Sequence, residues 1–330
     1  SSRLVLLRAL SKIKKENLVT QPNIDALVAH AAHADKLAKG FVYLQQVGIL
    51  TPENRATLVG HAANAYGLAL GFGCLQQVGI LSPENRATLV DHAANADGLA
   101  LAFKCLQKAG ILSPENRATL VGHAANAYNL ADGFGCLQQV GILTQENFET
   151  LFDQAAHANK HVRAFECLQQ VGLLTQQNFE DLVNQAAHAG ELAKGFKYLH
   201  QVRILTPENR ATLVGQAAYS EHLALGFKCL HEARILTPEN RSALVGQASN
   251  ADHLAEGFRC LQLVSMLTQA NIDALIGQAA HADYLSRWFE HLQQEGILTQ
   301  ENFTVLVHLS EQFQQSTIIS VVSRSMVLLH

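Results

Sequence analysis

The chain has 330 residues, of which 48% are hydrophobic and 16% are charged, and its formal net charge is −4. This composition is typical of a water-soluble protein and lacks the excess of basic residues that nucleic-acid-binding modules usually carry. The sequence contains no run of about eighteen apolar residues, so we expect no transmembrane helix and no membrane partner.

The chain begins with SSRLVLLRALSKIKK, where charges within an apolar stretch predict a helix rather than a signal peptide. A leucine then recurs every 31 residues, at Leu50, Leu81, Leu112, Leu143, Leu174, Leu205, Leu236, Leu267 and Leu298. A fixed period of this size indicates stacked supersecondary units. We therefore predict an all-α protein, an α-solenoid of nine two-helix copies over residues 19–297. Residues 1–18 should form a lone cap helix, and residues 298–330 a partial copy or cap.

Each copy opens with a phrase such as ILTPEN (49–54), whose residues suit the start of a helix. Thr51 is a typical N-cap, Pro52 suits the first helical position, and Glu53 suits the positive end of the helix dipole. Asn54 recurs in all ten openings. We expect its side chain either to reach back to the cap backbone or to bond to the neighbouring copy.

The remainder of the copy predicts a second helix. After the first helix the letters AAN interrupt the helical spacing, and Asn64 is a candidate second N-cap. Leu68, Phe72 and Leu75 then follow at helical spacing. The small residue Gly71 beside them indicates a close approach between helices. The two helices should span about eleven and about fourteen residues.

The six cysteines share one position of the repeat, at Cys74, Cys105, Cys136, Cys167, Cys229 and Cys260. Stacked helices lie roughly 8–10 Å apart, whereas a disulfide needs Cα atoms within roughly 7 Å of each other. We therefore expect free thiols in the core, which are typical of a reducing, cytosol-type compartment.

The sixteen histidines raise the question of a metal or catalytic site. One position near the end of the first helix holds His in the first four copies and Gln in the later ones, and we expect it to form a row of hydrogen bonds. His30 and His33 lie one helical turn apart but have no third ligand. The chain has no nucleophile elbow, phosphate loop or HExxH motif. We expect no metal, no cofactor and no enzymatic activity.

The first helix comes in two versions, which differ three residues before its buried leucine. That position holds arginine at Arg55, Arg86, Arg117, Arg210 and Arg241, and an apolar residue at Ile24, Phe148, Phe179, Ile272 and Phe303. Because an arginine stem can cover the same apolar surface, we expect the guanidinium to lie in water.

The copies differ most on one face of the second helix, at the positions equivalent to Tyr66, Leu70, Gly73 and Gln77, which we call the strip. We interpret the strip as a recognition surface, because solenoids bind partners along an extended face. Its most adhesive part should be Tyr66, Leu70, Leu101 and Tyr128. The candidate partner-binding residues are Tyr66, Leu70, Asp97, Leu101, Lys104, Tyr128, Asp132, Arg163, Lys194 and Lys197.

The opening LTPENRATLVGHAANA resembles the repeats of transcription-activator-like effectors, which read DNA with a residue pair after the first helix. The resemblance implies base-reading positions at His30, His61, His92, His123, Gln154, Gln185, Gln216, Gln247 and Gln278. Only His-Ala and Gln-Ala pairs occur there, and the glycine pair of that family is replaced, for example by Ala63-Asn64. With a net charge of −4, nucleic-acid binding is the disfavoured alternative.

The phrase GILTQENF, at Gly141–Phe148 and Gly296–Phe303, resembles two-helix repeats in secreted effectors of intracellular bacteria that use type IV secretion. The resemblance covers residues 19–308 and implies an interaction platform inside a host cell. We expect a monomeric, non-enzymatic scaffold whose partner is a protein. The alternatives are a divergent nucleic-acid-binding array and a targeting segment of a larger effector.

Overall fold

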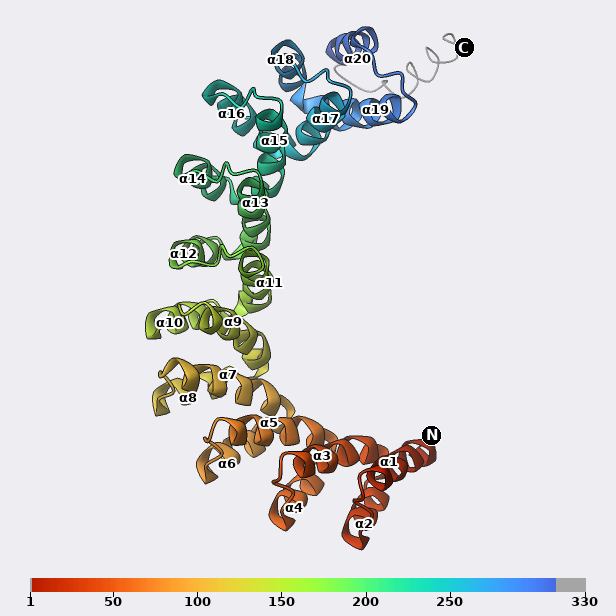
Figure 1. Ribbon diagram of the computed structural model, residues 1–330, viewed down its shortest axis with the longest axis vertical. Helices are drawn as coiled ribbons and strands as arrows, with labels where there is room; N and C mark the ends of the chain where they lie inside the picture. Colours follow the sequence, from red (N-terminus) through yellow and green to blue (C-terminus); the bar gives the residue numbers. More distant parts are fainter. Residues whose placement is uncertain (1, 313–330) are drawn as a thin grey trace. The chain divides into compact units, whose positions relative to one another are not determined.

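The structure is a computed structural model that describes residues 2–312 of the chain. The described residues form twenty α-helices and nine short 3-10 turns, with no strand among them (Figure 1). The predicted fold, an all-α solenoid of stacked two-helix repeats, is confirmed. The part of the expected C-terminal cap in residues 313–330 lies outside the described residues.

The helices fall into two compact units, of which the first holds α1 to α12. It begins with the lone helix α1 (Ser2–Lys15). The first helices of its copies are α2 (Gln21–Ala29), α4 (Pro52–Gly60), α6 (Pro83–Asp91), α8 (Pro114–Gly122), α10 (Gln145–Asp153) and α12 (Gln176–Asn184). The second helices are α3 (Ala34–Gln46), α5 (Ala65–Gln77), α7 (Ala96–Ala109), α9 (Ala127–Gln139) and α11 (Ala158–Gln169).

The second unit holds α13 to α20. Its first helices are α14 (Pro207–Gly215), α16 (Pro238–Val245), α18 (Gln269–Gly277) and α20 (Gln300–Gln312). Its second helices are α13 (Ala189–Gln201), α15 (Ser220–Glu232), α17 (Ala251–Leu263) and α19 (Ala282–Gln294).

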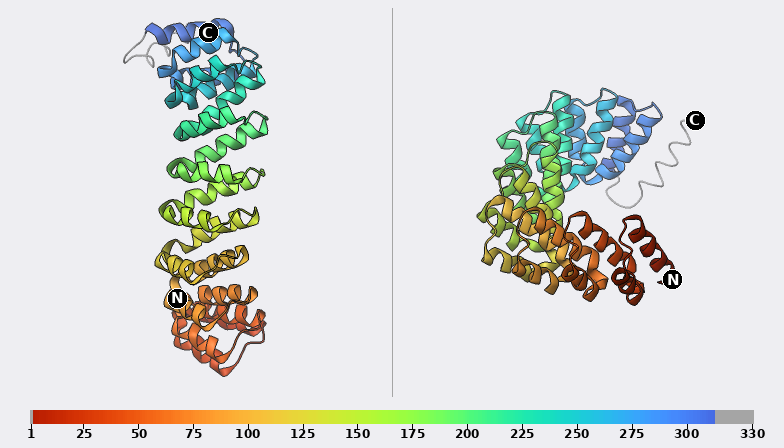
Figure 2. Two further views of the ribbon diagram at one scale, coloured as in Figure 1. Left: turned by 90° about the vertical axis from the view of Figure 1, so that its left-hand side faces the viewer. Right: turned by 60° about the horizontal axis from the view of Figure 1, so that its bottom comes forward.

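In each unit the second helices pack directly on one another in a row, and the first helices stand beside that row (Figures 1 and 2). Every second helix from α3 to α19 contributes a fully buried phenylalanine, namely Phe41, Phe72, Phe103, Phe134, Phe165, Phe196, Phe227, Phe258 and Phe289. A Cβ added at Gly71 would lie 3.0 Å from the backbone oxygen of Ala96, at the start of the next second helix. The close approach predicted from this small residue is thus confirmed.

The predicted N-cap forms from the second copy onward. The Thr51 hydroxyl accepts a hydrogen bond from the Asn54 backbone N–H at 3.1 Å, and Ser82 and Ser113 do the same for their copies. The first copy is the exception, because the Thr20 side chain makes no cap bond. Caps of this kind satisfy backbone donors that the first turn of a helix leaves unpaired.

The recurring asparagine ties two elements together. Asn116 Nδ2 donates to the Ile111 backbone oxygen, 2.7 Å away in the loop before the helix, rather than to the cap. The same carboxamide exchanges two hydrogen bonds with Gln145 of the next copy, at 2.7 and 3.1 Å. The expected bond to the neighbouring copy therefore forms at Asn116, but not at Asn54, whose Nδ2 donates to the Ile49 oxygen at 2.7 Å and whose Oδ1 has no partner among the described residues.

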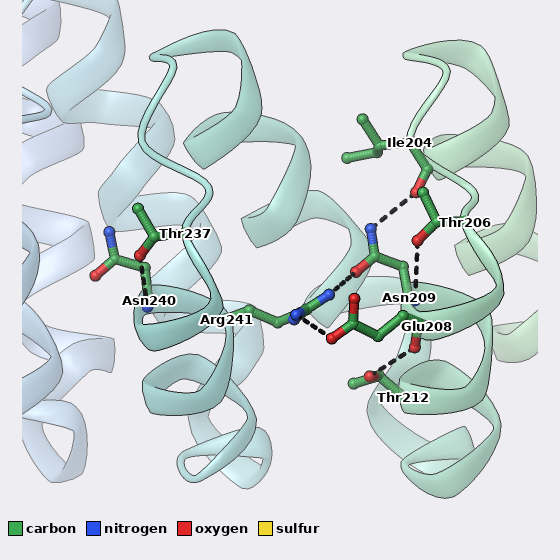
Figure 3. A network of polar contacts seen from close by, with 8 residues as sticks. All are labelled: Ile204, Thr206, Glu208, Asn209, Thr212, Thr237, Asn240 and Arg241. Carbon is green, nitrogen blue, oxygen red and sulfur yellow. Dashed lines mark hydrogen bonds and ion pairs between the residues drawn. The ribbon is translucent and has the colours of Figure 1, made fainter.

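In the copies that begin with α8 and α16, the arginine of the first helix donates to the Oδ1 atom of the recurring asparagine in the preceding copy. Arg241 Nη1 donates to Asn209 Oδ1 at 2.8 Å, and its other terminal nitrogen pairs with Glu208 (Figure 3). Arg117 makes the equivalent bond to Asn85 at 2.7 Å, with its side chain only 18% exposed. The expectation that the guanidinium lies in water is therefore wrong, because a buried carboxamide oxygen needs a donor. The Arg86 guanidinium also lies over the Phe72 ring, with its central carbon 5.5 Å from the ring centre.

Two kinds of joint between copies result, and each uses a matched set of residues. Copies with proline at the first helical position carry arginine three residues later, as in Pro238 and Arg241. Copies with glutamine there carry Phe or Ile instead, as in Gln145 and Phe148. Phe148 packs on Phe134 of the preceding copy with ring centroids 5.4 Å apart. One position thus supplies the donor in one version and the apolar contact in the other.

The link between the two helices of a copy differs from the prediction. The first helix usually has nine residues and the second usually thirteen. Between them lies one 3-10 turn, at Ala31–His33, Ala62–Asn64, Ala93–Asn95, Ala124–Asn126, Ala155–His157, Ala186–His188, Ala217–Tyr219, Ala248–Asn250 and Ala279–His281. Asn64 precedes α5, but its side chain makes no cap hydrogen bond. Its backbone N–H bonds to the His61 oxygen at 2.8 Å instead, because the turn continues the helical hydrogen bonding.

We predict that Asn147→Ala destabilises the protein by about 2–3 kcal/mol. The substitution removes the bond to the Ile142 oxygen and both bonds with Gln176. Gln176→Ala leaves the bond to Ile142 in place and should cost about 1 kcal/mol. Urea unfolding followed by circular dichroism measures both, and equal losses would contradict a separate role for the loop bond.

Candidate functional site

The structure brings part of the strip together in a groove of the first unit. Leu101 and Lys104 of α7, Asp132 of α9 and Glu166 of α11 line this groove, whose volume is about 380 Å³. We call it the α7–α11 groove. Three of the ten candidate partner-binding residues, Leu101, Lys104 and Asp132, therefore share one concave site.

Two candidates of the first unit are exposed aromatic residues. Tyr66 is 37% and Tyr128 54% exposed. The Lys39 ammonium lies 5.8 Å from the centre of the Tyr66 ring, so neighbouring copies meet along the strip. Both tyrosines present the amphipathic surface that dominates many protein interfaces.

The remaining candidates are spread along the strip. Leu70 and Asp97 are half-buried and Arg163 is exposed. The Asp97 carboxylate accepts the backbone N–H of Gly98 at 2.9 Å. In the second unit, Lys194 pairs with Glu221 at 2.8 Å, and Lys197 is half-buried. These residues do not join the α7–α11 groove.

Four further residues of the groove lie at strip positions that the sequence analysis did not single out, namely Lys108, Gly135, Gln139 and Glu166. Cys105 and Cys136 line it as well. The signal for Gly135 was its place inside a helix, where glycine is unfavourable unless something approaches closely.

A second groove lies at the equivalent place in the other unit. Leu225, Lys228 and Cys229 of α15 line it together with Glu256 and Arg259 of α17, and its volume is about 390 Å³. These residues stand four periods, or 4 × 31 = 124 residues, after their counterparts in the α7–α11 groove. We call this site the α15–α17 groove.

The cysteines are free thiols, as expected. Burial raises the pKa of Cys105 and Cys136 to about 11 each, and that of Cys260 to about 12. Cys74 Sγ lies 3.6 Å from the backbone oxygen of Ala100 in the next second helix. Protonated thiols in such surroundings are weak nucleophiles at neutral pH.

The His and Gln residues at the end of the first helix do not form the expected row of hydrogen bonds. In the described part of the chain, no hydrogen bond joins one of these side chains to the next. The His123 ring instead meets the Phe152 ring edge-on, with centroids 4.5 Å apart. Gln278 accepts a bond from Ser310 at 3.3 Å.

His161 is a titratable residue of the core that the sequence analysis did not single out. It occupies the place that leucine takes in the other complete copies, such as Leu68 and Leu130, and is 1% exposed. Neither ring nitrogen has a hydrogen-bond partner. The ring stacks on Phe165 at 5.9 Å. Burial, with a smaller effect of His157, lowers the pKa of His161 to about 4.

Residues 2–312 contain no group of three or more His, Cys, Asp or Glu side chains placed to hold a metal ion. Nor is any single helix among them long and apolar enough to cross a membrane. The helices Pro52–Gly60 and Ala62–Gln77 meet that test only as a pair bent by 101°.

Comparison of the chain with known protein families, with characterised proteins and with solved structures finds no match.

We predict that acid destabilises the protein through His161. The unfolded chain binds a proton with a pKa near 6.5, whereas the folded protein does so only near pH 4. Stability is therefore lost as the pH falls from about 6.5 to about 4, by on the order of 3 kcal/mol. His161→Leu should remove this part of the pH dependence of the urea midpoint. The control is His200→Leu at an exposed position, and an unchanged pH profile in His161→Leu would contradict the assignment.

Proposed function

We propose that the protein is a non-enzymatic scaffold that binds a protein partner along the strip. One observation carries the proposal: the core and the joints repeat from copy to copy, whereas the strip varies and forms grooves. The buried phenylalanine of the second helix is the same in every complete copy. Two strip positions beside it present Leu101 and Lys104 in one copy, but Asp132 and Gly135 in the next.

The chemistry of the strip suits a protein surface. Exposed tyrosines, half-buried leucines and charges of both signs lie within a few copies of one another. Interfaces between proteins use such mixtures of aromatic anchors and polar groups. Because buried phenylalanines and close backbone approach fix the spacing of the second helices, the strip presents these groups on a rigid support.

The positions that the base-reading resemblance implies suit nucleic acid less well. His92 lies beside a groove of about 260 Å³ between α6 and α8, and Glu84 and Asp91 line the same groove. The one arginine there, Arg117, is paired with Glu84 at 3.1 Å. An acidic wall repels phosphates. This arrangement favours a protein partner over the alternative of a nucleic-acid-binding array.

The setting that we propose is the inside of a host cell, where the scaffold would act as a bacterial effector or as the targeting segment of a larger one. The resemblance of the GILTQENF phrases to repeat effectors supports this setting. The free thiols are compatible with a reducing compartment.

We predict that Asp substituted together at Tyr66, Leu70, Leu101 and Tyr128 weakens partner capture at least about tenfold. Pull-down from host lysate with quantitative mass spectrometry measures the capture, and circular dichroism should show an unchanged fold. Tyr219→Asp with Tyr284→Asp is the matched control, because these tyrosines are 39% and 43% exposed and lie outside the strip. Equal capture by all three proteins would place the binding surface elsewhere.

We also predict no gel shift with random duplex DNA or RNA at low salt, because the charge of −4 gives no bulk attraction for phosphates. Binding at micromolar concentration that weakens with added salt would overturn the protein-scaffold proposal.

A further inference from the structure

The α7–α11 groove contains charges without partners. Lys104 and Lys108 come from α7, Asp132 from α9 and Glu166 from α11. In the described part of the chain, none of these four residues takes part in an ion pair within 4.0 Å. Burial raises the pKa of Asp132, and the nearby charge of Glu166 raises it further. The charge of Glu166 thus acts unfavourably on the Asp132 carboxylate, and neither carboxylate has an ion-pair partner in the described part of the chain.

The floor of this groove is open at Gly135, which lies inside α9. A Cβ added there would meet no atom within 4 Å, whereas one at Gly71 would meet the Ala96 oxygen at 3.0 Å. Glycine destabilises a helix interior relative to alanine. At Gly71 a neighbouring helix explains the small residue, but at Gly135 nothing in the first unit fills the space.

The α15–α17 groove shows what fills the equivalent space in another copy. Arg259 stands at the position of Gly135, and Glu256 and Glu290 stand at the positions of Asp132 and Glu166. Arg259 Nε donates to Glu256 at 3.0 Å, and its Nη2 lies 3.9 Å from Glu290. The hydrogen bond from Arg259 lowers the pKa of Glu256, in contrast to the raised pKa of Asp132.

The second difference between the grooves concerns the lysines. Glu232 replaces Lys108 in the α15–α17 groove and lies 4.0 Å from Lys228, the counterpart of Lys104. In the α15–α17 groove, Arg259 thus pairs with the acidic residues and Glu232 pairs with the lysine. The α7–α11 groove has acidic residues and a lysine at the same positions, but has no counterpart of Arg259 or of Glu232.

We propose that the α7–α11 groove binds an arginine side chain of a protein partner, with its guanidinium between Asp132 and Glu166, in the place that Arg259 takes in the α15–α17 groove. An acidic residue near that arginine would meet Lys104 and Lys108. Arginine suits the site better than lysine, because its planar group can donate to two carboxylates at once. This inference deepens the proposed function and rests on it.

The test uses a displayed library of random twelve-residue peptides, selected on the full chain. Enriched peptides are synthesised with a fluorophore and measured by anisotropy. We expect them to share an arginine, and we expect its replacement by citrulline to weaken binding at least about tenfold. Gly135→Arg should have the same effect, since the new side chain would fill the groove as Arg259 does. Asp132→Asn with Glu166→Gln is a second variant that leaves the shape of the groove unchanged.

The other groove offers a gain-of-function control. Arg259→Gly with Glu232→Lys copies the α7–α11 arrangement into the α15–α17 groove and should raise the stoichiometry of the peptide from one to two. Circular dichroism checks that each variant keeps its helicity.

Five outcomes would overturn the inference. Selected peptides that lack arginine, or that bind Gly135→Arg unchanged, would remove the arginine site. If binding of such peptides is nevertheless abolished by the Asp substitutions at Tyr66 and Tyr128, the proposed function of the strip survives. If N-acetyl-arginine amide bound as tightly as the selected peptides, the groove would be a small-molecule site rather than a site for a protein partner. Self-association that Gly135→Arg abolishes would assign it to a second copy of this chain. A selection that yields no binding peptide would count against both proposals.

Discussion

From Asn85 onward, the polar contacts between consecutive first helices of each unit converge on the side-chain amide of a recurring asparagine. In Asn116 the amide nitrogen fixes the loop before the helix through the Ile111 oxygen, and the same carboxamide bonds to Gln145 of the next copy. The second helices hold together by buried phenylalanines and close backbone approach. The first helices stand beside that row, so a specific polar contact matters more for their placement. A buried carboxamide is costly to leave unpaired, and this cost makes the joint selective.

The constancy of the joints gives the strip its freedom to vary. The strip residues do not contribute to the asparagine contacts and lie on the second helices, where they project from a fixed backbone. The two grooves show the consequence. Leu101 and Leu225 are equivalent, as are Cys105 and Cys229, yet the exchange of Gly135 for Arg259 changes an open charged groove into one that is neutralised within the chain. The surface that we propose for recognition can therefore differ between copies while their architecture stays the same.

The sequence was sufficient for the period, the fold class and the cap at Thr51, because these depend on spacing along one chain and on local hydrogen bonds. It was insufficient where a side chain meets the next copy. We expected the Arg117 guanidinium to be hydrated, because the sequence does not show that the Asn85 side-chain oxygen lies opposite it in the preceding copy. Asn64 has the right residue type for a cap, but the backbone N–H groups there are already satisfied by a continuous 3-10 turn. In the candidate site, the strip was foreseeable from variation between copies. The empty space at Gly135 was not, because it depends on what surrounds a residue that has no side chain.

The shared acceptor has a consequence for how such a chain can change in length. The asparagine oxygen accepts a donor from the next copy at Asn85, Asn116, Asn147, Asn209, Asn240 and Asn271, from an arginine such as Arg241 or from a glutamine such as Gln145. The Oδ1 atoms of Asn23 and Asn54 have no hydrogen-bond partner among residues 2–312. Among the six copies that share the contact, the joints do not encode the order, and unequal recombination that duplicates or deletes 31 residues in frame joins two compatible ends. An array of this design can lengthen, shorten or shuffle its strip in single genetic steps, without a compensating mutation at the new boundary.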